Sequence, residues 1–152
     1  MAEGITALRE AREAGQPANG EASPHHLLLT EDACEQWDTA AKVNPPLRSR
    51  ADEEVLIEAL AEGLIDVIAT DHAPHAATDK ICTYNEAAYG INVLETAFSS
   101  IFTLVDVDPK MLSLGRLIES LTAGPAAILG RDLGSLEKGY SADVTLIDPE
   151  MK

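Results

Sequence analysis

The chain has 152 residues, of which 45% are hydrophobic and 24% are charged, a composition that suits one globular domain with a real core. Its formal net charge of −15 argues against nucleic acid and anionic membrane surfaces as partners, because like charges repel. No apolar run approaches the ~20 residues that span a bilayer, and the amino terminus shows no signal-peptide pattern. We expect a cytoplasmic protein in which Cys34 and Cys82 are reduced thiols.

The first third of the chain is predicted to hold two helices with irregular chain between them. Apolar residues at helical spacing predict a helix over 2–14, and a second helix is expected over 31–36. Residues 16–22 contain proline, asparagine and glycine, which makes them poor strand material. His25 and His26 are expected in an extended segment, where adjacent side chains point in opposite directions. Both therefore cannot easily bind one metal ion, and one of them is expected to be a packing histidine.

The middle of the chain is predicted to run from a stiff loop through a helix into a strand. Val43–Arg48 is expected to be extended, because each of its two prolines restricts the residue before it. Ser49 resembles the start of a capping box, from which a helix would run to about Glu62. The apolar, β-branched run Leu64–Thr70 is typical of a strand covered on both faces. The order of helix, strand and functional loop suggests a βα repeat and hence an α/β fold.

The carboxyl-terminal part is predicted to be mainly helical. The predicted elements are, in order, a loop over 76–89, helices over 92–105 and 110–121, a short helix from Gly124, turns over 134–139 and a strand over 142–147. This strand stands apart from the helices and is expected to belong to a different layer.

The strongest chemical signal comes directly after the predicted strand over 64–70, where Asp71, His72 and His75 occur within five positions. In α/β proteins, catalytic residues gather just past the carboxyl ends of parallel strands. A carboxylate and imidazoles suit zinc or another first-row divalent ion, and an aspartate can also move a proton. The alternative is structural: Asp71 would cap a turn, and the two histidines would be ordinary loop residues.

Two further segments carry weaker signals. The prolines after Asn44 stiffen its loop, so that its amide could recognise a polar ring with little entropy left to lose. Arg48 could clamp a substrate, although an ion-paired surface arginine is the simpler interpretation. Gly90, after Tyr89, could let the backbone approach a ligand, although glycines before helices are common. The residues alone thus indicate a metal-assisted or acid/base site in an α/β protein.

Four segments of the chain occur in an order that resembles a known family. They are Ser23–Thr30, Lys42–Arg48, Asp66–His75 and Gly90–Ala97. Together they resemble dihydroorotases of the longer bacterial type, in the amidohydrolase superfamily. The closing residues 139–144 resemble that superfamily's return to a small β domain. The resemblance runs over nearly the whole chain.

The resemblance implies the carboxyl-terminal part of a metal-dependent (β/α)8 TIM barrel. Residues 1–133 would be its last βα units, and residues 134–152 would be the return strand toward the small β domain. Such a barrel typically takes ~250 residues and carries its site at the carboxyl ends of the strands. The implied reaction is the reversible, zinc-dependent cyclisation of N-carbamoyl-L-aspartate to dihydroorotate in de novo pyrimidine biosynthesis. One or two zinc ions serve the complete family site.

Particular residues match the family's functional positions. By resemblance, Asp71 is a metal ligand and the proton shuttle of the reaction. Asn44 and His75 match substrate-contacting positions, with His75 facing the substrate carboxylate. Tyr89 and Gly90 match the loop whose backbone meets the pyrimidine ring. Hydantoinases and allantoinases generally lack the Asn44 and His75 features, although another cyclic amidohydrolase remains the alternative.

Of the family's metal ligands, this sequence carries Asp71 alone, since its four histidines form no His-x-His motif. We therefore expect a carboxyl-terminal fragment of a dihydroorotase, inactive alone because one carboxylate cannot hold a catalytic metal. The alternatives are half of a split enzyme, completed by an amino-terminal half, and a non-catalytic dihydroorotase-like scaffold for aspartate transcarbamoylase. The expected partners are a small-molecule substrate and one of these polypeptides or a second copy of the chain.

Overall fold

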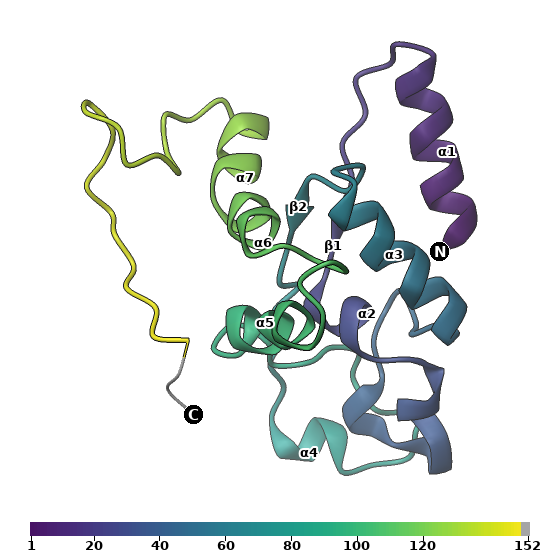
Figure 1. Cartoon of the computed structure of the whole chain (residues 1–152). Coiled ribbons are helices and arrows are strands. Elements are labelled where there is room, and N and C mark those ends of the chain that lie inside the picture. Colours follow the sequence, from purple (N-terminus) through teal and green to yellow (C-terminus); the bar gives the residue numbers. More distant parts are fainter. Residues whose placement is uncertain (150–152) are drawn as a thin grey trace.

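The computed structural model describes residues 1–149 and consists of helices around a two-stranded parallel sheet (Figure 1). The elements in chain order are α1 (Ala2–Glu13), β1 (Glu21–Ala22), α2 (Pro24–Leu28), η1 (Glu31–Trp37), η2 (Thr39–Ala41), α3 (Arg50–Ala61), β2 (Val67–Ile68), α4 (Ala77–Lys80), α5 (Ala97–Val107), α6 (Leu114–Leu121) and α7 (Ala123–Ile128). Within the described residues, every helix is too short or too polar to span a bilayer.

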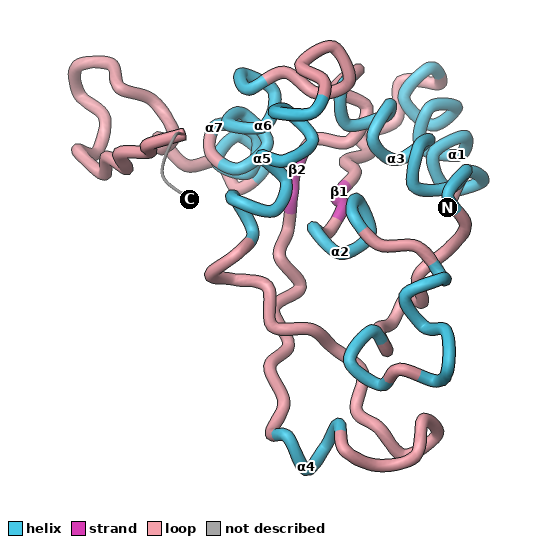
Figure 2. Tube along the Cα trace, turned by 60° about the horizontal axis from the view of Figure 1, so that its bottom comes forward, coloured by secondary structure: helices cyan, strands magenta, loops and turns pink. Residues whose placement is uncertain are grey.

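The two strands bring distant parts of the sequence to one edge. β1 and β2 are parallel, with Glu21 opposite Val67 and Ala22 opposite Ile68. β1 and β2 lie side by side in Figure 2, and because they are parallel their carboxyl ends point the same way, with α3 in the chain between them. The strand predicted over 64–70 is confirmed at its centre, in β2. The segments that come after β1 and β2 therefore lie at a common edge, where the sequence places its acid and its histidines.

β1 forms in spite of its poor strand composition, because residues outside it hold the backbone. The Gly20 N–H donates to the Asp66 carboxylate at 2.8 Å, and the Gly20 carbonyl accepts from the Asp66 N–H at 2.9 Å. Arg12 of α1 binds the same carboxylate at 2.5 Å. Residues 16–22, which their composition makes poor strand material, thus do form a strand at Glu21–Ala22, where partners from other elements outweigh local propensity.

The helices cover the sheet from two sides. α1 and α3 pack against each other on one flank, while α6 packs against β2 and is followed by α7 (Figure 1). The buried apolar residues between these elements form the main core: Ala22, Leu27, Leu56, Ile57, Ala59, Leu60, Leu64, Ile65, Ile68, Ile101, Val105, Leu112 and Leu117. Leu56 and Leu60 lie on the buried face of α3, as the helical spacing predicts.

The amino-terminal cap of α3 also fixes α1. The Ser49 hydroxyl oxygen accepts from the Asp52 N–H at 3.3 Å, which confirms the predicted helix start. The Asp52 carboxylate accepts from the Ala2 N–H and pairs with the Met1 amino group, both at 3.0 Å. These hydrogen bonds, that from Ala2 first, hold the pKa of Asp52 well below its ordinary value. Gly63, with a φ of 79°, ends the helix in the left-handed region.

The carboxyl-terminal segment departs from its predicted form. Residues 142–147 form no strand, and their side chains are exposed. Figure 1 shows the segment running away from the helices. An apolar pattern alone does not make a strand, since the backbone needs a partner to take its hydrogen bonds, and none lies beside this segment within residues 1–149. The other differences are small: α5 and α6 begin later than predicted, and α4 adds a turn of helix to the predicted loop.

Candidate active site

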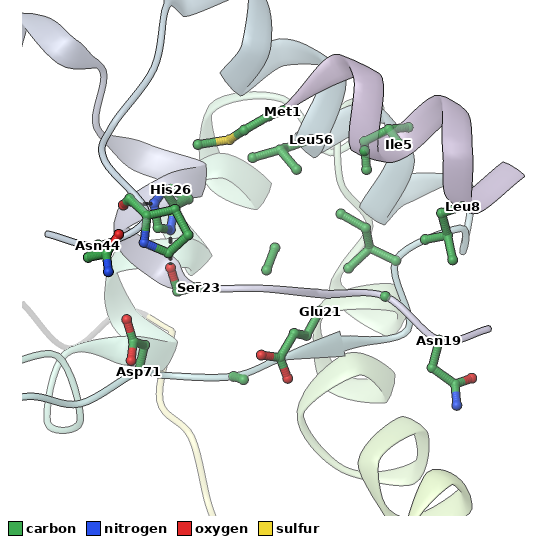
Figure 3. A pocket seen from close by; sticks show the side chains of 16 residues that line it. Met1, Ile5, Leu8, Asn19, Glu21, Ser23, His26, Asn44, Leu56 and Asp71 are labelled. Atoms are coloured by element: carbon green, nitrogen blue, oxygen red, sulfur yellow. Dashed lines mark hydrogen bonds between the residues drawn. The ribbon is translucent and has the colours of Figure 1, made fainter.

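A hollow of about 570 Å³ opens at the carboxyl ends of the strands. It is lined by residues of α1, β1, α2 and α3 and by the chain after β2. Figure 3 shows Ser23, His26, Asn44 and Asp71 gathered at one end of the hollow, Leu8 and Asn19 at the other, and the apolar side chains of Met1, Ile5 and Leu56 along one side. The structure therefore brings two predicted site residues, Asn44 and Asp71, to one place. Arg48 is exposed and lies outside the lining.

The Asp71 side chain is part of the lining of this hollow. It lies just after β2 and has a backbone φ of 48°, a left-handed conformation that aspartate tolerates better than most residues. Its side chain is 55% exposed, and Oδ2 lies 3.8 Å from Nε2 of His25. A partly solvated carboxylate at a strand end can both accept a proton and bind a cation.

The adjacent histidines lie on α2 rather than in an extended segment, which corrects the prediction. Pro24 occupies the first position of the helix, where a missing N–H costs nothing, and Ser23 precedes it with an extended backbone. The rings of His25 and His26 are tilted neighbours with centroids 4.5 Å apart. His26 bonds through Nδ1 to the Ser23 hydroxyl at 2.5 Å and through Nε2 to the Pro45 carbonyl at 2.9 Å. Both histidines are buried.

Burial also sets the charge of His25. Its side chain is 2% exposed, and desolvation lowers its pKa from 6.5 to about 4, with neighbouring His26 lowering it further and Asp71 acting in the opposite sense. His25 is therefore neutral at pH 7. Its Nδ1 atom is buried and has no hydrogen-bond partner in the described part of the chain. Because His25 is neutral, its 3.8 Å contact with the Asp71 carboxylate is not an ion pair.

His72 has a structural role in this geometry. Its Nδ1 atom accepts from the backbone N–H groups of Val93 at 3.2 Å and Leu94 at 3.0 Å. A short parallel bridge also pairs His72 with Ile91. Because Nδ1 is occupied by these bonds, the ring fastens the chain after β2 to residues 93 and 94, at the start of the 94–96 turn. The structural interpretation of His72 is thus the one that these contacts support.

His75, Tyr89 and Gly90 form a second group, which is not part of the lining of the hollow. Nε2 of His75 lies 2.8 Å from the Tyr89 carbonyl oxygen. Gly90 has a φ of 137°, and a Cβ atom there would lie 2.7 Å from the carbonyl oxygen of Ala73. Only glycine fits both the backbone angle and this close approach. His75 and the Tyr89–Gly90 segment are therefore packed together, and their substrate contacts stay a prediction.

Lys42 links the two groups, and the sequence interpretation missed it. Its side chain is buried, and Nζ donates to the carbonyl oxygens of Tyr84 at 2.6 Å, Asn85 at 3.3 Å and Ala87 at 2.7 Å. The ammonium also lies 4.3 Å from the centroid of the Tyr89 ring. Its backbone carbonyl accepts from Gly90 N–H at 2.9 Å. Lys42, two positions before Asn44, thus holds the 84–90 loop through its side chain and its backbone, and Nζ of Lys80 donates to the Ala88 carbonyl oxygen of the same loop at 2.8 Å.

The residues present do not form a complete metal site. Within residues 1–149, no group of three or more histidine, cysteine, aspartate or glutamate side chains lies close enough to hold an ion. One imidazole, that of His25, lies near Asp71. Its Nε2 atom is 3.8 Å from the Asp71 carboxylate and 3.0 Å from the Ser23 hydroxyl oxygen. A catalytic zinc usually takes three protein ligands. Asp71 can therefore serve as one ligand of an ion whose other ligands come from outside this set.

Comparison with known proteins places the chain in a family. Residues 8–152 match the Amidohydrolase family, and the chain belongs to that family. It is 44% identical over 144 residues to a dihydroorotase of Acetivibrio thermocellus, covering 95% of this chain and 34% of that protein. It is 48% identical over 146 residues to a dihydroorotase of Anaeromyxobacter dehalogenans, covering 95% of this chain and 33% of that protein. The chain thus spans about a third of the length of these curated relatives.

Solved structures give the same superfamily. The fold is similar to an L-hydantoinase (dihydropyrimidinase) from Arthrobacter aurescens, with a TM-score of 0.85, 33% identity and coverage of 93% of this chain and 32% of that one. A D-hydantoinase (dihydropyrimidinase) from Thermus sp. is similar with a TM-score of 0.82, 26% identity and coverage of 91% and 32%. The chain is therefore a piece of a TIM-barrel superfamily fold, and the dihydroorotase resemblance of its four segments is confirmed.

Proposed function

We propose that the chain supplies the carboxyl-terminal part of a dihydroorotase active site. The observation that carries the proposal is the meeting of Asn44 and Asp71 at one hollow, at the carboxyl ends of β1 and β2. The similarity to curated dihydroorotases over 95% of this chain supports it. In this proposal residues 1–133 are the last βα units of a (β/α)8 barrel, and residues 134–152 lead toward a small β domain.

The proposed reaction interconverts N-carbamoyl-L-aspartate and dihydroorotate. In the hydrolytic direction, water adds to the ring amide carbon, the C–N bond breaks, and the ring nitrogen takes up a proton. In the cyclising direction the same bond forms and water leaves. Asp71 is the group that we assign to hold and deliver this proton, because its carboxylate is exposed at the strand end. The zinc of the proposal would take Asp71 as its ligand from this chain.

The substrate contacts are assigned from the two groups of residues. Asn44 lines the hollow beside Asp71, where its amide can donate to and accept from a pyrimidine ring. His75 is assigned to the substrate carboxylate, and Tyr89 and Gly90 to the ring edge, because the Lys42 contacts fasten their loop close to Asn44. The two groups would then meet across the bound substrate.

A hydantoinase-type activity is the second candidate, favoured by the fold similarity to the Arthrobacter aurescens enzyme. Asn44 and His75 argue for dihydroorotate, because the hydantoin ring carries no carboxylate for an imidazole to bind. A non-catalytic scaffold for aspartate transcarbamoylase is the third. It would not need the Asp71 carboxylate.

A chimaera tests the proposal. The matching third of the Acetivibrio thermocellus relative is replaced by residues 2–149 of this chain, and dihydroorotate formation and hydantoin hydrolysis are measured with added zinc. We expect the chimaera to form dihydroorotate and the chain alone to be inactive. Asn44→Ala in the chimaera should raise KM. Turnover by the chain alone, or a folded chimaera that is inactive or prefers hydantoin, would refute the proposal.

A further inference from the structure

We propose that His25 is a positioning residue for Asp71, held by a one-way chain of hydrogen bonds that begins at the Pro45 carbonyl oxygen. The inference rests on the proposed function of Asp71. It concerns a buried side chain with an unpartnered ring nitrogen, 3.8 Å from the carboxylate, to which the reaction assigned no role. This series of hydrogen bonds would fix the position of the Asn44–Pro45 segment relative to Asp71.

The direction of these hydrogen bonds follows from which atoms can donate and which can only accept. The Pro45 carbonyl oxygen can only accept, so Nε2 of His26 carries a proton and donates to it. With the Nε2 proton in place, Nδ1 of His26 accepts from the Ser23 hydroxyl at 2.5 Å. The single hydroxyl proton is used there, so the Ser23 oxygen accepts from Nε2 of His25 at 3.0 Å. His25 must therefore carry its proton on Nε2.

The environment of His25 agrees with this tautomer. A proton on Nε2 leaves Nδ1 as a bare acceptor, and Nδ1 is the buried atom without a partner in the described residues. The reverse direction would place protons on both nitrogens of His26 and would bury a His25 Nδ1–H with nothing to accept it. The Nε2–H of His25 is thus donated to Ser23 at 3.0 Å, and Oδ2 of Asp71 lies 3.8 Å from the same nitrogen, beyond the length of a hydrogen bond. Hydrogen bonds at catalytic groups are often long before substrate binds and shorten in the complex.

The consequence is a link between two functional elements. Asp71 comes after β2, whereas Pro45 comes after Asn44 in the loop before α3, and their backbones share no element. Ser23, His25 and His26 lie between them at the end of β1. Nε2 of His25 lies in a fixed place 3.8 Å from Oδ2 of Asp71, so a small shift of the carboxylate would bring this oxygen within hydrogen-bond distance. His25 thereby orients Asp71 without itself touching substrate.

The test reads the ring nitrogens directly. Long-range ¹H–¹⁵N NMR of the full chain with ¹⁵N-labelled histidine, at pH 7, shows which nitrogen of each ring is protonated, and single His→Gln variants assign the signals. We expect the Nε2–H tautomer at both His25 and His26. Ser23→Ala should shift the signals of both rings, whereas Ser23→Thr, which keeps the hydroxyl, should not. An Nδ1–H tautomer at either ring, or unchanged His25 signals in Ser23→Ala, would overturn the proposal.

The link to Asp71 has its own control. Asp71→Asn should shift the Nε2 signal of His25 more than the signals of His72, which neighbours Asp71 in sequence but bonds to the 93–94 backbone. A response confined to His72 would mean that His25 does not sense the carboxylate. This comparison needs no turnover and holds even if the Ser23 variants fail to fold.

Two variants of the chimaera test whether His25 affects catalysis. The side-chain nitrogen of His25→Gln can occupy the place of Nε2, whereas that of His25→Asn stops near Nδ1. We expect His25→Asn to lower kcat roughly 10–100-fold with little change in KM, and His25→Gln to restore most of it. Equal kcat in both variants would refute the positioning role. An inactive chimaera with the expected tautomers would refute the proposed function instead, because the NMR result does not depend on activity.

Discussion

Replacing Lys42 by methionine removes the buried ammonium that donates to three carbonyl oxygens of the 84–90 loop. The change leaves the buried Ala87 carbonyl without its donor at 2.7 Å, a loss of about 1–3 kcal/mol. The cation–π contact with Tyr89 at 4.3 Å adds about 0.5–2 kcal/mol. The carbonyls of Tyr84 and Asn85 are less buried, so water can replace Nζ there.

We therefore expect Lys42→Met to lower the free energy of unfolding by about 2–4 kcal/mol. Urea denaturation of the purified chain measures this, with Lys138→Met as a control, because Lys138 is exposed and should change stability by less than about 0.5 kcal/mol. Hydrogen exchange at the Gly90 N–H, which donates to the Lys42 carbonyl, should also accelerate. Equal stability of the two variants would refute the role assigned to Lys42.

Two further outcomes are expected at single sites. Gly90→Ala should lower the free energy of unfolding by about 1–3 kcal/mol in urea denaturation, because the new Cβ would lie 2.7 Å from the Ala73 carbonyl oxygen at a φ of 137°. The control Gly4→Ala, in an open part of α1, should instead raise the free energy of unfolding by about 0.5–1 kcal/mol. Equal effects of the two substitutions would contradict the strain expected in Gly90→Ala. Burial holds the folded pKa of His25 at about 4, below its ordinary 6.5, so the unfolded chain binds this proton first as pH falls. The His25 contribution to stability is therefore full above pH 6.5 and declines by up to about 1.4 kcal/mol per pH unit toward pH 4. Urea titrations at several pH values should show a shallower decline in His25→Gln than in His72→Gln, and equal slopes would contradict the assignment.

Locally determined elements could be predicted from the sequence. The Ser49 cap, the Gly63 stop and the buried face of α3 depend on neighbours within a few residues, and all are present. β1 was missed because its backbone depends on Asp66, far along the chain. The strand over 142–147 was wrongly predicted for the converse reason: its pattern is right, but no described segment pairs with it.

The candidate site shows the same limit. Asn44 and Asp71 could be identified because their motifs are local, and the structure brings them to one hollow. Lys42 could not, because the carbonyls that identify it as an internal cation lie some forty residues further on. His25 and His26 were expected to be extended, although Pro24 is as well suited to the first turn of a helix as to a turn. The hydrogen bonds of His25 depend on that helix.

The central claim is that Asp71 moves the proton of the reaction. The most direct measurement is kcat for dihydroorotate formation by the chimaera, by its Asp71→Asn form and by a control, Asp106→Asn, which alters an exposed carboxylate on α5. A positioned proton-transfer group contributes roughly 10²–10⁴-fold, so we predict a loss of at least about 100-fold for Asp71→Asn and none for the control. Equal activity in a folded Asp71→Asn chimaera would contradict the account.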